Sequence, residues 1–160
     1  MRYVLGLGTN IGNREQNLRD AIAAPEHIPE TVILRQSAVY ETEPYGYAQQ
    51  DRFLNMAVLL ESAFPPEAML GACLGIEAGL GRVRLFKNGP RIIDLDVLLA
   101  EGFTADTPIL RVPHPEIRKR AFVLQPLMDL FPQGEAFGYT FLDAYRACTL
   151  YDIKKHLAAL

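Results

Sequence analysis

Two carboxylates stand two positions apart in an apolar segment of this chain. Asp94 and Asp96 lie within Gly-Pro-Arg-Ile-Ile-Asp-Leu-Asp-Val-Leu-Leu, residues 89–99. Because side chains alternate across a strand, both acids are predicted to share one face of a sheet while Ile93, Leu95 and Val97 point to the other. At ~7 Å apart and an effective dielectric near ~20, the two charges repel by roughly 2 kcal/mol. The fold must relieve that repulsion.

A divalent cation would relieve it. Carboxylates without His or Cys neighbours are hard oxygen ligands that suit Mg²⁺, which usually completes its shell with water and substrate phosphate. The alternative is a strand edge at which Asp94 and Asp96 are merely solvated, and the spacing alone favours neither reading.

Positive charge gathers next to the paired acids. Arg82, Arg84, Lys87 and Arg91 fall within ten residues of one another. Arginine side chains match the charge and geometry of phosphate groups, so the cluster fits a polyphosphate ligand. A solvated loop is the other reading of such a cluster.

Length and composition restrict the class of protein. A chain of 160 residues with 49% hydrophobic content suits a single domain, residues 1–160, that buries ~70% of its unfolded surface. A net charge of −3 argues against non-specific nucleic-acid binding, which needs a basic face.

Neither the cysteines nor the amino terminus suggests export. Cys73 and Cys148 lie in apolar helical patterns and are predicted to be core thiols. Residues 3–7 are too short for the core of a signal peptide, and no apolar run approaches the length of a membrane span. We therefore expect a cytoplasmic monomer that does not bind membranes.

The hydrophobic pattern predicts an ordered series of strands and helices. In chain order these are a strand at 3–8, a helix capped by Asn13 and ended by Pro25, strands at 31–42 and 53–62, a helix at 65–80, the strand of the paired acids, a helix at 115–128 and a last helix at roughly 141–157. This order predicts an α+β fold, a ferredoxin-like sandwich with a mostly antiparallel sheet. Glycine loops of the Rossmann or P-loop type do not follow any strand.

The helix predicted at 65–80 carries an acid on its apolar side. Its stripe runs Leu70, Cys73, Leu74 and then Glu77. A buried acid is costly unless it is paired. Glu77 therefore either sits at the edge of the stripe, reaching water or pairing with Arg82, or contacts a ligand directly.

Five motifs occur in order along the chain. They are Gly6-Leu-Gly-Thr-Asn10, Tyr40-Glu-Thr42 with Phe53-Leu-Asn55, Glu77 with Gly81-Arg-Val-Arg84, Gly89-Pro-Arg91 with Asp94-Leu-Asp96, and Val112-Pro-His-Pro115 with Arg120-Ala-Phe122. Together they resemble the motifs of the 6-hydroxymethyl-7,8-dihydropterin pyrophosphokinases of folate biosynthesis. The resemblance implies that the hydroxymethyl group of the pterin attacks the β-phosphorus of ATP, that AMP is released, and that two Mg²⁺ ions take part.

The resemblance also implies roles for individual residues. Asp94 and Asp96 are expected to bind the metal and, with Arg82 and Arg91, to be catalytic. The ATP-binding residues are expected to be Glu77, Arg82, Arg84, Arg91, His114 and Arg120. The pterin-binding residues are expected to be Thr42, Tyr45, Phe53, Asn55 and Phe122, with the two phenylalanine rings on either side of the flat ligand.

Each of these residues has a plainer reading. A phenylalanine in a strand or helix usually packs in the core. His114, between two prolines at a predicted helix start, would otherwise be a cap, and Arg84 would otherwise face solvent.

The loop 85–88 departs from some relatives. It has no tryptophan, so a ring that caps the pterin in those proteins is missing unless Phe86 replaces it. We expect the loops at 43–51 and 82–89 to close over bound ligands, because their composition supports little packing of their own.

Two other functions fit parts of the sequence. A nucleotidyltransferase also combines a small-residue turn with an Asp-x-Asp strand, but its turn normally sits close before the acids, whereas Gly8 and Thr9 lie far upstream here. A ligand-binding module of ferredoxin-like fold would leave both acids solvated and would not turn over ATP.

Overall fold

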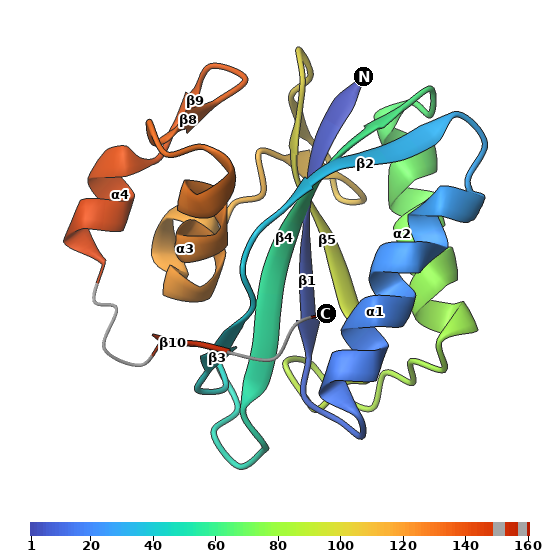
Figure 1. The fold of residues 1–160 in the computed structure, drawn as a ribbon, viewed down its shortest axis with the longest axis vertical. Helices are drawn as coiled ribbons and strands as arrows, with labels where there is room; N and C mark the ends of the chain where they lie inside the picture. Colours follow the sequence, from blue (N-terminus) through green and yellow to red (C-terminus); the bar gives the residue numbers. More distant parts are fainter. Residues whose placement is uncertain (149–152, 157–159) are drawn as a thin grey trace.

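The computed structural model of the protein, which describes residues 1–148, 153–156 and 160, is built around one antiparallel sheet (Figure 1). Its strands lie in the order β10-β3-β4-β1-β5, and β2 also pairs with β4. Their bounds are β1 Arg2–Thr9, β2 Thr31–Gln36, β3 Tyr40–Thr42, β4 Phe53–Ser62, β5 Asp94–Ala100 and β10 Ile153–Lys155. Every pairing among the described residues is antiparallel, which confirms the predicted α+β class.

Helices cover both faces of this sheet. Helices α1 (Arg14–Ala23) and α2 (Pro66–Gly79) lie on one face, and α3 (Ala121–Leu130) lies on the other, with α4 (Leu142–Ala147) packed beside α3 (Figure 1). The smaller elements are 3₁₀ turns at Ala24–His27 and Ile117–Lys119 and two short hairpins, β6 (Ala105–Asp106) with β7 (Arg111–Val112) and β8 (Glu135–Ala136) with β9 (Tyr139–Thr140).

Alternation along the strands produces two separate cores. On the face covered by α1 and α2, the buried residues include Leu5, Leu54 and Leu95. On the face covered by α3, Val4 and Leu98 pack with the apolar side of that helix. The predicted alternation in β5 is therefore confirmed, and its two acids lie on the α3 face, beyond the part that α3 covers.

Local signals placed the first two helices correctly. The Oδ1 of Asn13 accepts a hydrogen bond from the backbone N–H of Gln16 at 3.0 Å, so Asn13 is the predicted cap of α1. In α2, however, Leu74 is exposed and Met69 is buried in its place, so the predicted stripe of that helix was wrong at one position.

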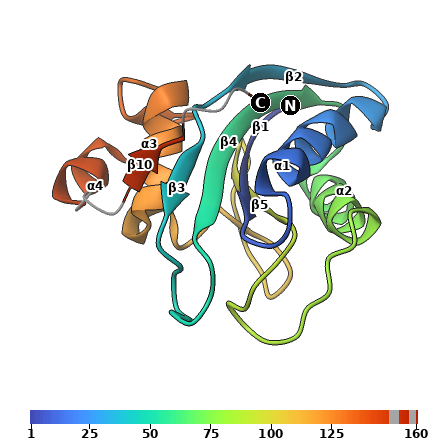
Figure 2. The ribbon, with the colours of Figure 1, turned by 60° about the horizontal axis from the view of Figure 1, so that its bottom comes forward.

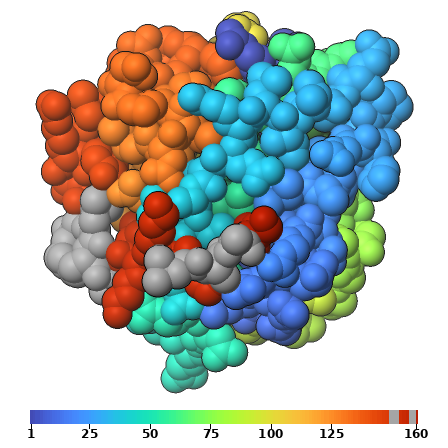
Figure 3. All heavy atoms as spheres, in the orientation of Figure 1, coloured from blue at the N-terminus to red at the C-terminus, as the bar shows by residue number. Residues whose placement is uncertain are grey.

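The predicted strand at 31–42 is two strands. Between β2 and β3, the Ser37 N–H donates to the Ala57 carbonyl, and the Ser37 hydroxyl accepts from the Ala57 N–H, both at 2.9 Å. A side chain thus takes one of the bonds that a continuous strand would have made with its main chain. In β2 itself, Val32 and Leu34 are exposed, and Figure 3 shows this strand at the surface between α3 and α1.

Both predicted carboxy-terminal helices need correction. The helix predicted at 115–128 begins at Ala121, because Arg120 is extended (φ −116°, ψ 106°) and separates it from the preceding 3₁₀ turn. The helix predicted at 141–157 ends at Ala147, and β10 instead pairs with the edge of β3. The rest of that prediction falls partly on residues 149–152 and 157, outside the described residues.

Within the described residues, no helix combines the length and apolar character needed to cross a bilayer.

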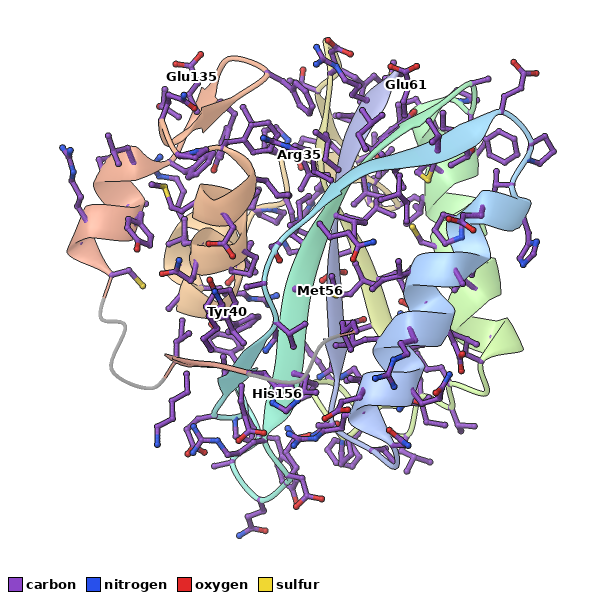
Figure 4. The ribbon with its side chains drawn as sticks, viewed as in Figure 1. Arg35, Tyr40, Met56, Glu61, Glu135 and His156 are labelled. Carbon is purple, nitrogen blue, oxygen red and sulfur yellow. The ribbon has the colours of Figure 1, made fainter. Side chains whose placement is uncertain are left out.

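A polar contact ties the sheet to α3: the Tyr40 hydroxyl donates to Asp129 Oδ2 at 2.7 Å, and the Ala38 N–H donates to the same oxygen at 3.0 Å. Figure 4 places Tyr40 between β3 and α3. Burial and the Asp129 carboxylate together raise the pKa of Tyr40.

Tyr40→Phe should lower the free energy of unfolding by about 1.5–3 kcal/mol, the usual value of a hydrogen bond to a charged group. Tyr47→Phe is the matched control, since among the described residues the Tyr47 hydroxyl donates only to the exposed Gln49 Oε1, at 3.4 Å. Urea unfolding of both variants measures the difference. Equal stability of the two variants would contradict a structural role for the Tyr40–Asp129 bond.

Candidate active site

The floor of the site is a stretch of bare backbone in the centre of the sheet. On β1, Gly8 lies opposite Asp94 of β5 and Asn55 of β4, and Gly6 lies opposite Asp96 and Ala57. A Cβ on Gly8 would lie 3.0 Å from Asn55 Oδ1. The middle strand therefore contributes no side chain, and a hollow forms between the flanking strands. The role of the two glycines was missed from the sequence, although their two-residue spacing on a strand is a signal for a shared face.

The first hollow is a cleft lined by aromatic, aliphatic and polar side chains, the mixture usual for small-molecule sites. All five predicted pterin-binding residues line it: Thr42, Tyr45, Phe53, Asn55 and Phe122. Asn55 Nδ2 donates to Thr42 Oγ1 at 2.7 Å, and both residues are buried. The cleft thus combines aromatic rings with a fixed pair of polar groups at its base.

Two arginines hold the Asp94 carboxylate, one on each oxygen. Arg82 Nη1 donates to Oδ1 at 2.5 Å, and Arg91 Nη1 donates to Oδ2 at 3.0 Å. The Arg91 guanidinium also lies 5.1 Å from the centroid of the Phe53 ring. The predicted catalytic arginines and Asp94 are therefore in direct contact.

The surroundings of Asp96 disfavour its charged form. Burial, followed by the charge of Asp94, raises the pKa of Asp96 to about 7, while the guanidinium of Arg120 opposes this shift. Asp94 and Asp96 line the same two hollows, so they share one face of the sheet, as predicted. The raised pKa means that the Asp96 carboxyl group is more readily protonated than usual.

Glu77 is enclosed, with only 3% of its surface exposed. Its Oε1 accepts the backbone N–H of Leu95 at 2.8 Å and lies 2.8 Å from Arg82 Nη1. Burial raises the pKa of Glu77, and the bonds to Leu95 and Arg82 oppose that shift. This is the arrangement expected from the pairing alternative, and a direct contact of Glu77 with ATP stays a prediction.

A second, basic hollow adjoins the first and shares several lining residues with it. It is lined by Arg82, Arg84, Lys87, Arg91, His114 and Arg120, together with both acids of β5. Apart from Glu77, every predicted ATP-binding residue therefore lines this hollow. The Arg84 side chain is 68% exposed, so in this structure it largely faces solvent. Its Nη2 makes a long ion pair with Glu77 Oε2, at 3.7 Å.

His114 does not stand at the start of a helix, because α3 begins seven residues later. Its Nδ1 accepts the N–H of Glu116 at 3.2 Å, which is the capping contact of a turn. Burial, together with Arg120, lowers the pKa of His114, so its ring tends to be neutral. The helix-start argument for anion binding was thus wrong, although the residue does line the basic hollow.

Polar side chains join the two loops that we expected to close. Figure 2 shows the loops at 43–51 and 82–89 projecting beyond the same end of the sheet. Asn10 Nδ2 donates to Gln50 Oε1 at 3.0 Å, and Gln50 Nε2 donates to the Asn88 carbonyl at 2.8 Å. Asn10 Oδ1 also accepts the Arg91 N–H at 2.9 Å. Sequence reasoning missed these linking residues, because their partners lie about 40 and 80 positions away.

Phe86 does not line the aromatic cleft. Its ring packs edge-on against Tyr47 of the other loop, with 5.1 Å between centroids, and borders the basic hollow. In this structure it is therefore a contact between loops, and the suggested replacement of a capping tryptophan is not seen.

The donor set at β5 fits a hard divalent cation. Within the described residues, no group of three or more His, Cys, Asp or Glu side chains could enclose a metal by itself. Asp94 and Asp96 supply two carboxylates beside an open basic hollow, so water and phosphate oxygens would have to complete the coordination, as is usual for Mg²⁺. A bound cation would also offset the cost of burying the Asp96 charge.

Glu77→Gln separates the two readings of this acid. The amide keeps an oxygen for the Leu95 N–H but loses the charge that faces Arg82, so we expect the free energy of unfolding to fall by about 1–3 kcal/mol. ATP affinity, measured by calorimetry, should change less than about twofold. The control is Glu67→Gln, at an exposed position of α2. Loss of ATP affinity at unchanged stability would show direct ligand contact instead.

Comparison with known proteins gives a consistent result. The family model of the 7,8-dihydro-6-hydroxymethylpterin-pyrophosphokinases matches residues 4–132. The 2-amino-4-hydroxy-6-hydroxymethyldihydropteridine pyrophosphokinase of Methylorubrum extorquens is 43% identical over 143 residues, 89% of this chain and 90% of that protein. Its counterpart in Bacillus subtilis is 42% identical over 131 residues, 82% of this chain and 78% of that protein.

Solved structures agree on the fold. The crystal structure of Plasmodium falciparum HPPK-DHPS superposes with a TM-score of 0.71 at 16% identity and covers 96% of this chain. This chain spans 47% of that longer protein, and the likeness concerns the fold alone. On the strength of the family match and the sequence relatives, the chain belongs to the 7,8-dihydro-6-hydroxymethylpterin-pyrophosphokinase family.

Proposed function

We propose that this protein transfers pyrophosphate from ATP to the hydroxymethyl group of 6-hydroxymethyl-7,8-dihydropterin and releases AMP, in folate biosynthesis. The observation that carries the proposal is the junction of the two hollows. Asn88, Arg91, Asp94, Asp96 and Arg120 line both the aromatic cleft and the basic hollow. An acceptor in the first and a triphosphate in the second would meet at these residues.

The aromatic cleft suits a flat, polar heterocycle. Phe53 and Phe122 offer ring faces, which add about 1 kcal/mol per stacked pair beyond area burial. Asn55 and Thr42 hold a fixed amide and hydroxyl that match the amide-like edge of a pterin. Family membership supports this acceptor, because the relatives named above carry it in their names.

The basic hollow suits the phosphates. Asp94 pairs with both Arg82 and Arg91, and Glu77 supplies the second negative charge through its own pair with Arg82. A triphosphate would compete for both guanidinium groups, and a cation would then replace them at the carboxylate. This exchange of partners leaves no charge of the site without a counter-charge. It also gives the arginines a place beside the transferred group.

We infer that Asp94 and Asp96 hold Mg²⁺, with two ions expected. Mg²⁺ held by these carboxylates would supply positive charge to offset that of the phosphates. Arg82 and Arg91 supply preorganised donors for charge that develops during transfer. Phosphoryl transfer depends on alignment and charge neutralisation, so the chain needs no covalent intermediate.

Water must be kept from the transferred group. The loops at 43–51 and 82–89 are already linked through Gln50 and Asn88, so closing one loop would draw the other with it. We further propose that residues 1–160 act as one pyrophosphokinase domain, as a monomer in the cytoplasm. Its partners would be the two small substrates, with neither nucleic acid nor membrane involved.

The nucleotide product tests the reaction directly. Incubation with ATP, Mg²⁺ and 6-hydroxymethyl-7,8-dihydropterin should yield AMP and a pterin heavier by two phosphates, as seen by chromatography and mass spectrometry. Little AMP should form when the pterin is omitted, because the acceptor completes the site. Free pyrophosphate with an adenylated acceptor would indicate a nucleotidyltransferase, and no turnover at all would indicate a binding module.

Neutral substitutions at the paired acids test the metal assignment. Asp94→Asn and Asp96→Asn should each fold and lose at least ~10²-fold in kcat, the scale of one lost electrostatic contact to the transition state. Asp106→Asn, whose parent side chain is 89% exposed and distant in the fold, is the control. Near-normal kcat of either variant at ordinary Mg²⁺ concentration would overturn the assignment.

A further inference from the structure

Arg120 lies against two aromatic rings, whereas Arg91 combines one ring contact, with Phe53, with a salt bridge to Asp94. Its guanidinium carbon lies 4.9 Å from the centroid of the Tyr45 ring and 5.7 Å from that of Phe122. The two rings also contact each other, with 6.2 Å between centroids at 60°. These distances fall within the range of cation–π attraction.

Among the described residues, Arg120 forms no salt bridge, although its charge acts on the nearby Asp96 carboxylate. Arg82 and Arg91 are both anchored by Asp94, whereas the salt bridges among the described residues do not include Arg120. Its Nε is buried and has no hydrogen-bond partner in the described part of the chain. The orientation of Arg120 therefore depends on what its flat face packs against.

Tyr45 and Arg120 share the aromatic cleft, but only Arg120 of the two also lines the basic hollow. Tyr45 belongs to the loop at 43–51 and lines only the aromatic cleft, whereas Arg120 lines both the cleft and the basic hollow. A substitution of Tyr45 can thus change the basic hollow by altering the orientation of the Arg120 guanidinium, which packs on the Tyr45 ring. Phe122 lies in the first turn of α3, two residues after Arg120.

We propose that Tyr45 is a positioning residue for nucleotide binding, and that it acts by holding the guanidinium of Arg120 toward the phosphates of ATP. The inference rests on the proposed function, because it takes the basic hollow as the ATP site. Its consequence is a coupling between the substrates. A loop ordered by the acceptor fixes Tyr45, Tyr45 fixes Arg120, and ATP binds more tightly; by reciprocity, ATP strengthens acceptor binding equally.

The test compares two substitutions with ATP alone. Tyr45→Leu keeps apolar volume but removes the ring face, and should weaken binding of a non-hydrolysable ATP analogue with Mg²⁺ roughly fivefold, in the absence of any pterin. Tyr45→Phe keeps the ring and should bind the analogue like the parent protein. Isothermal calorimetry measures both. Parental affinity in Tyr45→Leu would overturn the inference, since Tyr45 would then serve only the acceptor.

A double-mutant cycle tests the route through Arg120. In an Arg120→Gln background, Tyr45→Leu should cause no further loss of affinity for the analogue. A loss of the same size in both backgrounds would overturn the inference. Tyr45 is 45% exposed in a loop, so we expect these variants to fold, as thermal unfolding will check; Tyr45→Ser repeats the test with a polar side chain.

The AMP assay separates this inference from the reaction itself. A parent protein that forms AMP with the pterin, combined with a Tyr45→Leu variant of unchanged ATP affinity, would refute only the positioning role. A parent protein that forms no AMP would refute the proposed reaction, while the binding cycle would still measure the Tyr45–Arg120 coupling on the nucleotide.

Discussion

The register between β1 and β5 fixes the chemistry of this molecule. Gly8 opposite Asp94 and Gly6 opposite Asp96 place the two acids beside a backbone floor. A slip of one residue would turn every side chain of the strand to the other face and would bring Leu7 into the hollow. Pairing of β1 with β4 sets Asn55 across the same floor. The charged centre thus belongs to the rigid sheet rather than to the loops.

The loops attach to that rigid frame through a small number of polar contacts. Asp94 on β5 binds Arg82 and Arg91, which flank the loop at 82–89. Asn10, just after β1, binds Gln50 of the loop at 43–51. Hydrogen bonds to charged groups are stronger than neutral ones, and phosphate oxygens accept the same guanidinium donors as carboxylates do.

Local patterns were sufficient for much of this structure. Alternation placed Asp94 and Asp96 on one face, and the Asn13 cap marked the start of α1. The features that were missed depend on distant partners. Ile153 pairs with Thr42 more than one hundred residues away, so a helical pattern gave way to a strand at a free sheet edge. The start of α3 was misplaced because Pro115 begins a turn, and the extended Arg120 delays the helix.

The bare floor also limits how the protein can change. Glycine is the smallest residue, so mutation cannot deepen the hollow at positions 6 and 8, and any larger side chain would fill it and press on Leu98 or Asn55. Altered ligand choice has to arise at the rim, in the loop at 43–51 or around Phe122. An inhibitor that contacts mainly this backbone would depend on few side chains, so few substitutions could weaken its binding.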